Sequence, residues 1–123
     1  EIKENELVEK TIQLVKELQI ESQCEFISFS LNICEQLKKL ASDFKVYYLN
    51  GDLSPSEIKE KGFDGLNCHY SIFLKNPTWI LQAKTLGLIT NSWTVNDVET
   101  FKKLKKLGIN FITTDIPDQL MNK

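Results

Sequence analysis

Short apolar runs alternate along this chain with longer stretches whose apolar residues recur at helical spacing. Residues 5–18 show the helical pattern clearly, because their apolar side chains return every three or four positions. Residues 45–49, Lys-Val-Tyr-Tyr-Leu, are rich in the β-branched and aromatic side chains that suit a strand. The pattern predicts strands at residues 1–3, 25–30, 45–49, 65–70, 88–95 and 111–114, and helices at residues 5–18, 31–40, 55–61, 77–86, 96–107 and from 117 onward.

Several of these helices have clear start and stop signals. Residues 54–57 read Ser-Pro-Ser-Glu, which is a capping box with proline at the first helical position. Gly62, Gly87 and Gly108 each follow a helical stretch, where a glycine easily adopts the left-handed conformation that ends a helix. These signals support the predicted boundaries.

The alternation of strands and helices predicts a parallel α/β fold. Parallel neighbours are joined by right-handed crossovers, so the sheet is either open and doubly wound or part of a barrel. No Gly-x-Gly-x-x-Gly or Gly-x-x-x-x-Gly-Lys turn follows any predicted strand. The nucleotide-binding versions of the open sheet therefore lose support. No internal linker is visible, and we expect one compact unit.

Composition narrows the class of protein further. The 123 residues are 41% hydrophobic and 26% charged, which is typical of a globular domain with its own core. The net charge is -2, and lysines alternate with glutamates, so we expect no nucleic-acid partner. No apolar run reaches the roughly 18 residues of a transmembrane helix.

The three cysteines predict neither a disulfide framework nor a zinc site. Their number is odd, and no Cys-x-x-Cys spacing occurs. Cys34 lies on the apolar face of a predicted helix, and Cys24 lies at the start of a predicted strand. We expect buried, unreactive thiols.

Functional groups of parallel α/β proteins collect at the carboxyl ends of the strands. Glu1 and Lys3 lie on the same face of the first predicted strand, because side chains alternate with period two. A carboxylate can bind a hard divalent cation, and an ammonium group can hold a phosphate oxygen. The other residues at predicted strand ends are Ser28 to Ser30, Asn50, Cys68 to Tyr70, Trp93, Asn96 and Asp115.

Two segments near the end of the chain carry a family resemblance. Residues 91–96 read Asn-Ser-Trp-Thr-Val-Asn, and residues 112–117 read Ile-Thr-Thr-Asp-Ile-Pro. They resemble the C-terminal signature of the glycerophosphodiester phosphodiesterases. Glu-x-Lys at residues 1–3, Ser-Phe at 28–29 and Leu-Asn at 66–67 follow the order of the same family. The resemblance implies that residues 1–123 are the C-terminal portion of a single TIM (β/α)8-barrel domain, with about six of its eight strands.

The resemblance also implies a reaction and a site. Members of this family are phosphoric diester hydrolases that use a divalent cation, calcium or magnesium, to convert glycerophosphodiesters to glycerol 3-phosphate and an alcohol. In this chain Glu1 would be a metal ligand, and Lys3 would be a catalytic residue that also binds substrate. Phe29 and Trp93 would line the substrate pocket.

Other parts of the family's site have no counterpart in these residues. The opening His-Arg-Gly, the Glu-x-Asp metal pair and the second catalytic histidine are absent from the sequence. We therefore expect negligible activity from this chain alone. We also expect a missing N-terminal segment, or a second copy of the chain, to complete the barrel.

Some roles stay open at the level of the sequence. Trp93 either contacts substrate or packs as a large aromatic residue. Asn96 and Asp115 both precede predicted helices, so helix capping is favoured over catalysis for them. His69, the lone histidine, is favoured as a rim residue. The alternative functions are a non-catalytic βα module that acts as an assembly or regulatory partner, and a related phospholipase D-like phosphodiesterase.

Overall fold

A computed structural model of the protein describes all residues from 1 to 123. The strands are β1 (Glu25–Ser28), β2 (Lys45–Tyr48), β3 (Gly65–His69), β4 (Ile89–Trp93) and β5 (Phe111–Ile112). The α-helices are α1 (Val8–Glu17), α2 (Leu31–Leu40), α3 (Pro55–Glu60), α4 (Tyr70–Lys75), α5 (Trp79–Thr85), α6 (Val98–Leu107) and α7 (Pro117–Leu120). Two 3-10 turns, η1 (Asn5–Leu7) and η2 (Glu21–Gln23), flank α1.

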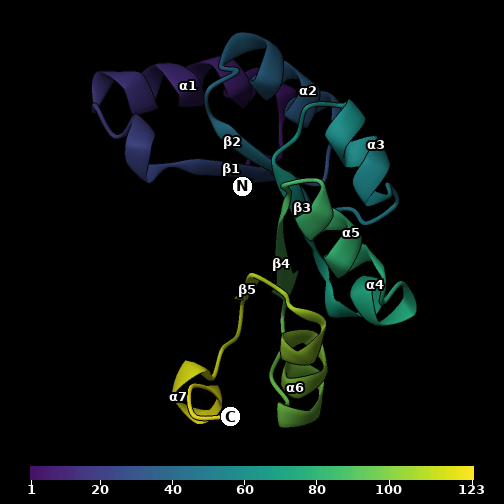
Figure 1. The fold of residues 1–123 in the computed structure, drawn as a ribbon. Coiled ribbons are helices and arrows are strands. Elements are labelled where there is room, and N and C mark those ends of the chain that lie inside the picture. The colour runs from purple at the N-terminus through teal and green to yellow at the C-terminus, as the bar shows by residue number, and fades with distance from the viewer.

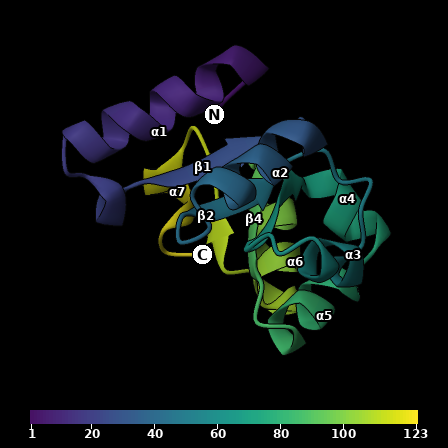
Figure 2. The same cartoon turned by 90° about the horizontal axis from the view of Figure 1, so that it is seen from above.

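The five strands form one parallel sheet in the order in which they occur along the chain, β1-β2-β3-β4-β5. Figure 1 shows the chain passing from α1 and α2 at one end of the sheet to α6 and α7 at the other. Seen from above, α1, α3, α4 and α5 lie around the outside of the strands (Figure 2). A doubly wound sheet reverses its strand order at a switch point. This sheet has no reversal, so its topology is that of a barrel segment.

The main core lies between the sheet and its helices. Even-numbered strand residues point into this core, and Val46, Leu66 and Cys68 are fully buried there. Ile33 and Leu37 of α2 and Ile58 of α3 pack into the same hydrophobic cluster. Odd-numbered residues point to the opposite, concave face. That face carries several polar and aromatic side chains, and the candidate site lies on it.

The predicted strand at residues 1–3 is not a strand in the structure, so the sheet has five strands rather than six. The segment nevertheless lies beside β1. The Ile2 backbone N–H donates to the Ile27 carbonyl at 3.0 Å, and the Ser28 hydroxyl donates to the Ile2 carbonyl at 2.7 Å. One edge residue with two hydrogen bonds is too short a pairing to make a ladder.

The helix boundaries agree with the capping signals at several points. Ser54 and Glu57 form the predicted capping box, in which the Glu57 N–H donates to Ser54 Oγ at 3.3 Å. Gly108 ends α6 with a φ of 89°, as expected for a left-handed residue. Helix α4 was not predicted, because its N-cap is His69, a residue type with no strong capping preference.

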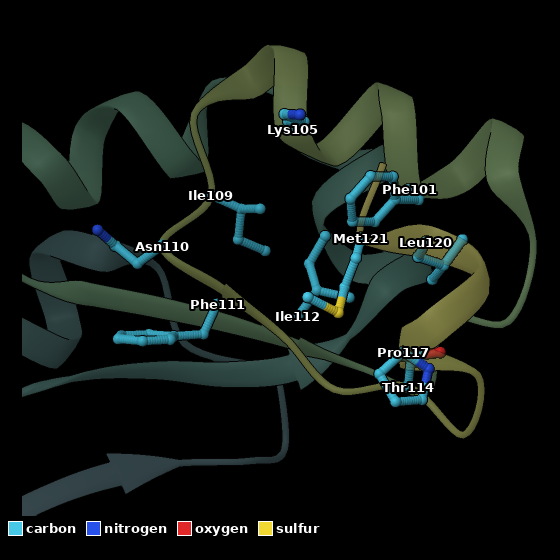
Figure 3. Close-up of a pocket in the computed structure, with 10 residues that line it drawn as sticks. All are labelled: Phe101, Lys105, Ile109, Asn110, Phe111, Ile112, Thr114, Pro117, Leu120 and Met121. Carbon is cyan, nitrogen blue, oxygen red and sulfur yellow. The ribbon is translucent and has the colours of Figure 1, made fainter. Parts of the chain in front are cut away.

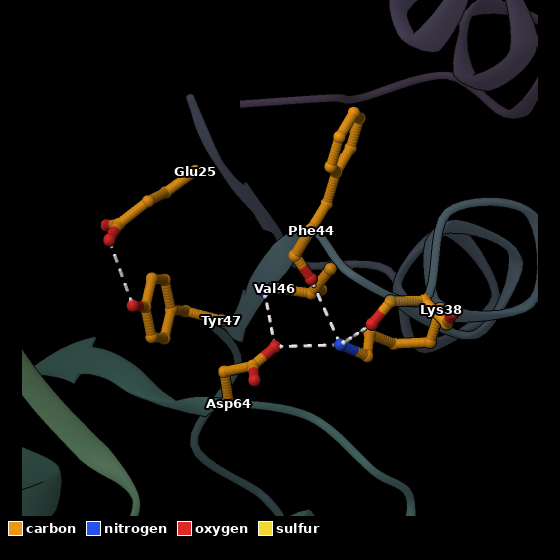
Figure 4. A network of polar contacts seen from close by, with 7 residues as sticks. Glu25, Lys38, Phe44, Val46, Tyr47 and Asp64 are labelled. Carbon is orange, nitrogen blue, oxygen red and sulfur yellow. Dashed lines mark hydrogen bonds and ion pairs between the residues drawn. The ribbon is translucent and has the colours of Figure 1, made fainter. Parts of the chain in front are cut away.

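A polar network holds the amino ends of β2 and β3 together (Figure 4). Lys38 Nζ lies 3.0 Å from Asp64 Oδ2 and also donates to the carbonyls of Ser42 and Phe44. Asp64 Oδ2 accepts the Val46 N–H at 2.9 Å. This network lies at the end of the strands opposite to the predicted site, so we infer that it stabilises the fold and takes no part in the site.

Candidate active site

Three of the four predicted site residues line one cavity on the concave face. Glu1, Phe29 and Trp93 surround a space of about 240 Å³. They come from the N-terminal segment, the end of β1 and the end of β4, three points far apart in the sequence. The remaining lining residues are Ile27, Leu49, Asn67 and Thr113. The strand ends therefore meet as expected for a parallel sheet.

Lys3 lies next to this cavity. Its ammonium is 3.5 Å from Glu1 Oε1, and the Lys3 side chain is 81% exposed while that of Glu1 is 24% exposed. Both residues line a second cavity of about 300 Å³, together with Phe29. Ile2 is buried between them. Because side chains alternate in an extended segment, the buried Ile2 turns Glu1 and Lys3 to the same face. The structure thus brings the predicted pair together, while their chemical roles stay a prediction.

Trp93 is held firmly by its neighbours. Its indole N–H donates to the Asn67 carbonyl at 2.9 Å. The ring packs edge-to-face against Phe29, with centroids 5.8 Å apart, and against His69, with centroids 5.4 Å apart. These contacts establish the packing role. The ring also lines the 240 Å³ cavity, so a substrate contact is compatible with the same position.

His69 serves as a helix cap at the rim. Its Nδ1 accepts the Ser71 N–H at 3.2 Å and lies 2.7 Å from Ser71 Oγ. The tautomer that fits this contact carries its proton on Nε2. The rim position agrees with the sequence-based interpretation.

The structure corrects the roles predicted for Asn96 and Asp115. The cap of α6 is Asp97, whose carboxylate accepts the Thr100 N–H at 2.8 Å. The side chain of Asn96 bonds to Asp115 instead, and α7 begins without any side-chain cap. Asp97 also precedes the helix and is a good capping residue, so the sequence prediction was wrong by one position.

Asn67 is a site residue that the sequence analysis did not identify. It lies in the middle of β3 and is only 8% exposed. Its Oδ1 atom is buried without a hydrogen-bond partner. A sequence signal existed, because Asn67 and His69 share the concave face by period-two alternation. A polar residue in the middle of a buried strand needs an explanation.

The chain by itself does not assemble a complete metal site. No group of three or more His, Cys, Asp or Glu side chains in the structure could hold a metal ion. Glu1 is the only carboxylate in the 240 Å³ cavity. A hard cation takes six or more oxygen ligands. Glu1 therefore fits the part of one ligand, and the other protein ligands would have to come from outside these residues.

A further hollow lies elsewhere on the molecule. A cavity of about 400 Å³ opens between α6, β5 and α7, with Phe101, Ile112 and Met121 among its walls (Figure 3). Its lining is mostly apolar and contains none of the predicted site residues.

No helix of the structure combines the length and apolar character needed to cross a bilayer.

The sequential parallel sheet, with its polar and aromatic groups gathered at the carboxyl ends of the strands, defines a segment of a (β/α)8 barrel. Comparison with known proteins then identifies the family. The model of the glycerophosphoryl diester phosphodiesterase family matches residues 1–119, so the chain belongs to that family. The resemblance found in residues 91–96 and 112–117 is confirmed, and so is the partial-barrel fold.

Solved structures and curated relatives agree with this assignment. The crystal structure of a glycerophosphodiester phosphodiesterase from Parabacteroides distasonis superposes with a TM-score of 0.92 and 36% identity, over 95% of this chain and 49% of that chain. The glycerophosphocholine phosphodiesterase of Homo sapiens is 28% identical over 73% of this chain and 16% of its own length. The glycerophosphodiester phosphodiesterase of Caldanaerobacter subterraneus is 28% identical over 93% of this chain and 47% of its own length. The chain thus spans less than half of each of these proteins.

Proposed function

We propose that this chain is the C-terminal part of a metal-dependent hydrolase of glycerophosphodiesters, which releases glycerol 3-phosphate and an alcohol. The observation that carries the proposal is the meeting of Glu1, Phe29 and Trp93 around one cavity, with Lys3 beside it. The family assignment supports the reaction class. The human relative, a glycerophosphocholine phosphodiesterase, suggests glycerophosphocholine as the first substrate to test.

In this proposal Lys3 and Glu1 have different electrostatic roles: Lys3 binds the phosphate group, and Glu1 binds the cation. The exposed Lys3 ammonium can donate to phosphate oxygens and stabilise the negative charge that grows on them in the transition state. The Glu1 carboxylate would be one ligand of a calcium or magnesium ion, which would supply Lewis-acid polarisation of the phosphoryl group. Phe29 and Trp93 form the apolar wall that orients the carbon chain of the substrate and excludes water.

We further propose that the barrel is completed by protein outside these residues. The sheet has two open edges, because β1 pairs only with β2 within the sheet and β5 pairs only with β4. Phe111 on β5 is 60% exposed, although a strand residue of this size is usually covered. Open edges with apolar side chains promote association with another chain. The N-terminal half of the same barrel is the occupant that the half-length match to the relatives favours, and a second copy is the alternative.

Light scattering on the isolated 123-residue chain tests this second proposal. We expect dimers or larger species, and we expect a monomer once the N-terminal half of the barrel is present. A soluble, well-folded monomer of the isolated chain contradicts it.

Hydrolysis by the full-length protein tests the proposed reaction. We expect release of glycerol 3-phosphate from glycerophosphocholine with calcium or magnesium, and loss of the activity with EDTA. Glu1→Gln and Lys3→Met should each reduce kcat/KM by about 10² or more, the usual effect of removing one group that stabilises transition-state charge. Glu4→Gln and Lys10→Met are matched controls on exposed neighbouring positions. A full-length protein that is inactive with every metal contradicts the reaction, and favours a non-catalytic βα module.

A further inference from the structure

We propose that the side chain of Asn67 hydrogen-bonds a hydroxyl group of the glycerol moiety of the substrate. This inference rests on the proposed function and assigns a specificity role to a residue outside the predicted set. It starts from the unpaired Asn67 Oδ1 atom on the concave face.

The position of Asn67 suits a ligand contact. Asn67 lines the same 240 Å³ cavity as Glu1 and Trp93, and it is more than nine-tenths buried. The Asn67 backbone carbonyl is already taken by the Trp93 indole N–H, at 2.9 Å. That bond fixes the indole beside the Asn67 side chain but leaves the amide itself without a partner. No hydrogen bond holds Oδ1 in place, so a rotation of the amide would exchange the positions of its oxygen and its nitrogen at the cavity.

The unpaired amide is exceptional in its surroundings. Asn91 is the register partner of Asn67 on β4 and points to the same face. Its Oδ1 accepts the Thr113 hydroxyl at 3.3 Å. Asn110, at the start of β5, accepts both the N–H and the hydroxyl of Thr90. Buried polar groups are nearly always paired, so an exception such as Asn67 Oδ1 needs an explanation, and a functional role is one of them.

The chemistry of the cavity favours a polyol over other ligands. An amide offers one acceptor and two donor hydrogens, and a hydroxyl can use either kind. The remaining walls are mostly apolar, from Ile27, Phe29 and Leu49, and they suit the carbon atoms of a short chain. A glycerol moiety meets these conditions.

Calorimetric titration of the full-length protein with two ligands tests the inference. Glycerol 3-phosphate carries the hydroxyls, and propyl phosphate has the same carbon chain without them. We expect the wild type to bind glycerol 3-phosphate at least tenfold more tightly than propyl phosphate. Asn67→Leu should weaken glycerol 3-phosphate binding tenfold to a hundredfold and leave propyl phosphate unchanged, because a ligand hydroxyl then loses its buried partner. Asn91→Leu, the same change at the register partner, should alter neither affinity.

Several outcomes overturn the inference while leaving the proposed function intact. One is equal binding of the two ligands by a wild type that still hydrolyses glycerophosphocholine, a comparison that needs no variant. Another is an Asn67→Leu protein that loses thermal stability at unchanged affinity, which assigns the amide a partner within the completed barrel. A third is a raised requirement for calcium or magnesium in Asn67→Leu, which assigns it to the cation. A wild type that neither hydrolyses glycerophosphodiesters nor binds glycerol 3-phosphate overturns the proposed function, and this inference with it.

Discussion

The Asn96 side chain bonds twice to Asp115. Its Oδ1 accepts the Asp115 backbone N–H at 2.9 Å, and its Nδ2 donates to Asp115 Oδ2 at 2.9 Å. The same Oδ1 also accepts the Thr114 hydroxyl at 3.1 Å. The loop after β4 is thereby tied to the loop after β5. We call these three hydrogen bonds of Asn96 the clamp. The clamp joins the two segments that carry the family resemblance, and Trp93 and Thr113 of the same segments line the cavity.

Substitutions at Asn96 and Asp115 test the clamp. Asn96→Ala should lower the free energy of unfolding by about 1 kcal/mol, since the three hydrogen bonds are exposed and their effects do not add fully. Asn96→Asp should cost more, because it replaces a donor by a second carboxylate. Combining Asn96→Asp with Asp115→Asn restores a donor–acceptor pair and should recover most of that loss. Urea unfolding of the wild type, Asn96→Asp, Asp115→Asn and the double variant measures the coupling, and strictly additive changes contradict the clamp.

Gly65 marks a point of close approach within the sheet. A Cβ atom there would lie 2.0 Å from the Ile89 carbonyl oxygen and 2.9 Å from Tyr47 Cδ1. Backbone of the neighbouring strand cannot move aside cheaply, so Gly65→Ala should cost about 3 kcal/mol or more, at the upper end of overpacking effects. Gly62→Ala is the matched control, since a Cβ there meets nothing within 4 Å. Its left-handed conformation should cost only about 1 kcal/mol. Equal urea midpoints for the two variants contradict the steric account.

Much of the fold could be predicted from the hydrophobic pattern, because each helix packs one face against the sheet. The apolar residues of that face therefore recur at helical spacing along the sequence. The segment at residues 1–3 was misassigned, since its alternation was right but a strand also needs a sustained partner ladder. Helix α4 was missed because His69 caps it through an imidazole nitrogen. The local sequence pattern does not reveal how residues 1–3 pair with β1, because that pairing depends on the tertiary structure.

The candidate site was predicted in part for the same reason. The ends of β1 and β4 converge and bring Phe29 and Trp93 together, and the extended segment at residues 1–3, which runs beside β1, adds Glu1 to the same cavity. Asn67 received no role beyond the Leu-Asn pair, because its significance lies in an Oδ1 atom without a hydrogen-bond partner, which only the packed structure shows. Asn96 and Asp115 each had a plausible local role as caps, and the contact between them spans 19 positions in sequence.

The buried cysteines should resist thiol reagents. Burial raises the pKa of Cys34 to about 12, with a further contribution from Glu35. Burial also raises the pKa of Cys68 to about 12, helped by Asp52. Cys24 is only partly buried, so the expectation of a buried thiol does not hold for this residue. At pH 8 we expect a disulfide reagent to label only Cys24 quickly in the folded protein, and all three cysteines in guanidinium. Rapid labelling of Cys24→Ser under native conditions contradicts this expectation.

The Asp97 cap should make stability depend on pH. Hydrogen bonds from the Thr100 backbone lower the pKa of the Asp97 carboxyl below its ordinary value. A group with a lowered pKa in the folded state stabilises that state above its unfolded pKa of about 3.9, and the contribution disappears as the pH falls through the folded value. The urea midpoint should therefore fall as the pH drops below about 3.9, more steeply in the wild type than in Asp97→Asn. The asparagine keeps a capping oxygen and cannot titrate, so parallel pH profiles for the two proteins contradict the role assigned to Asp97.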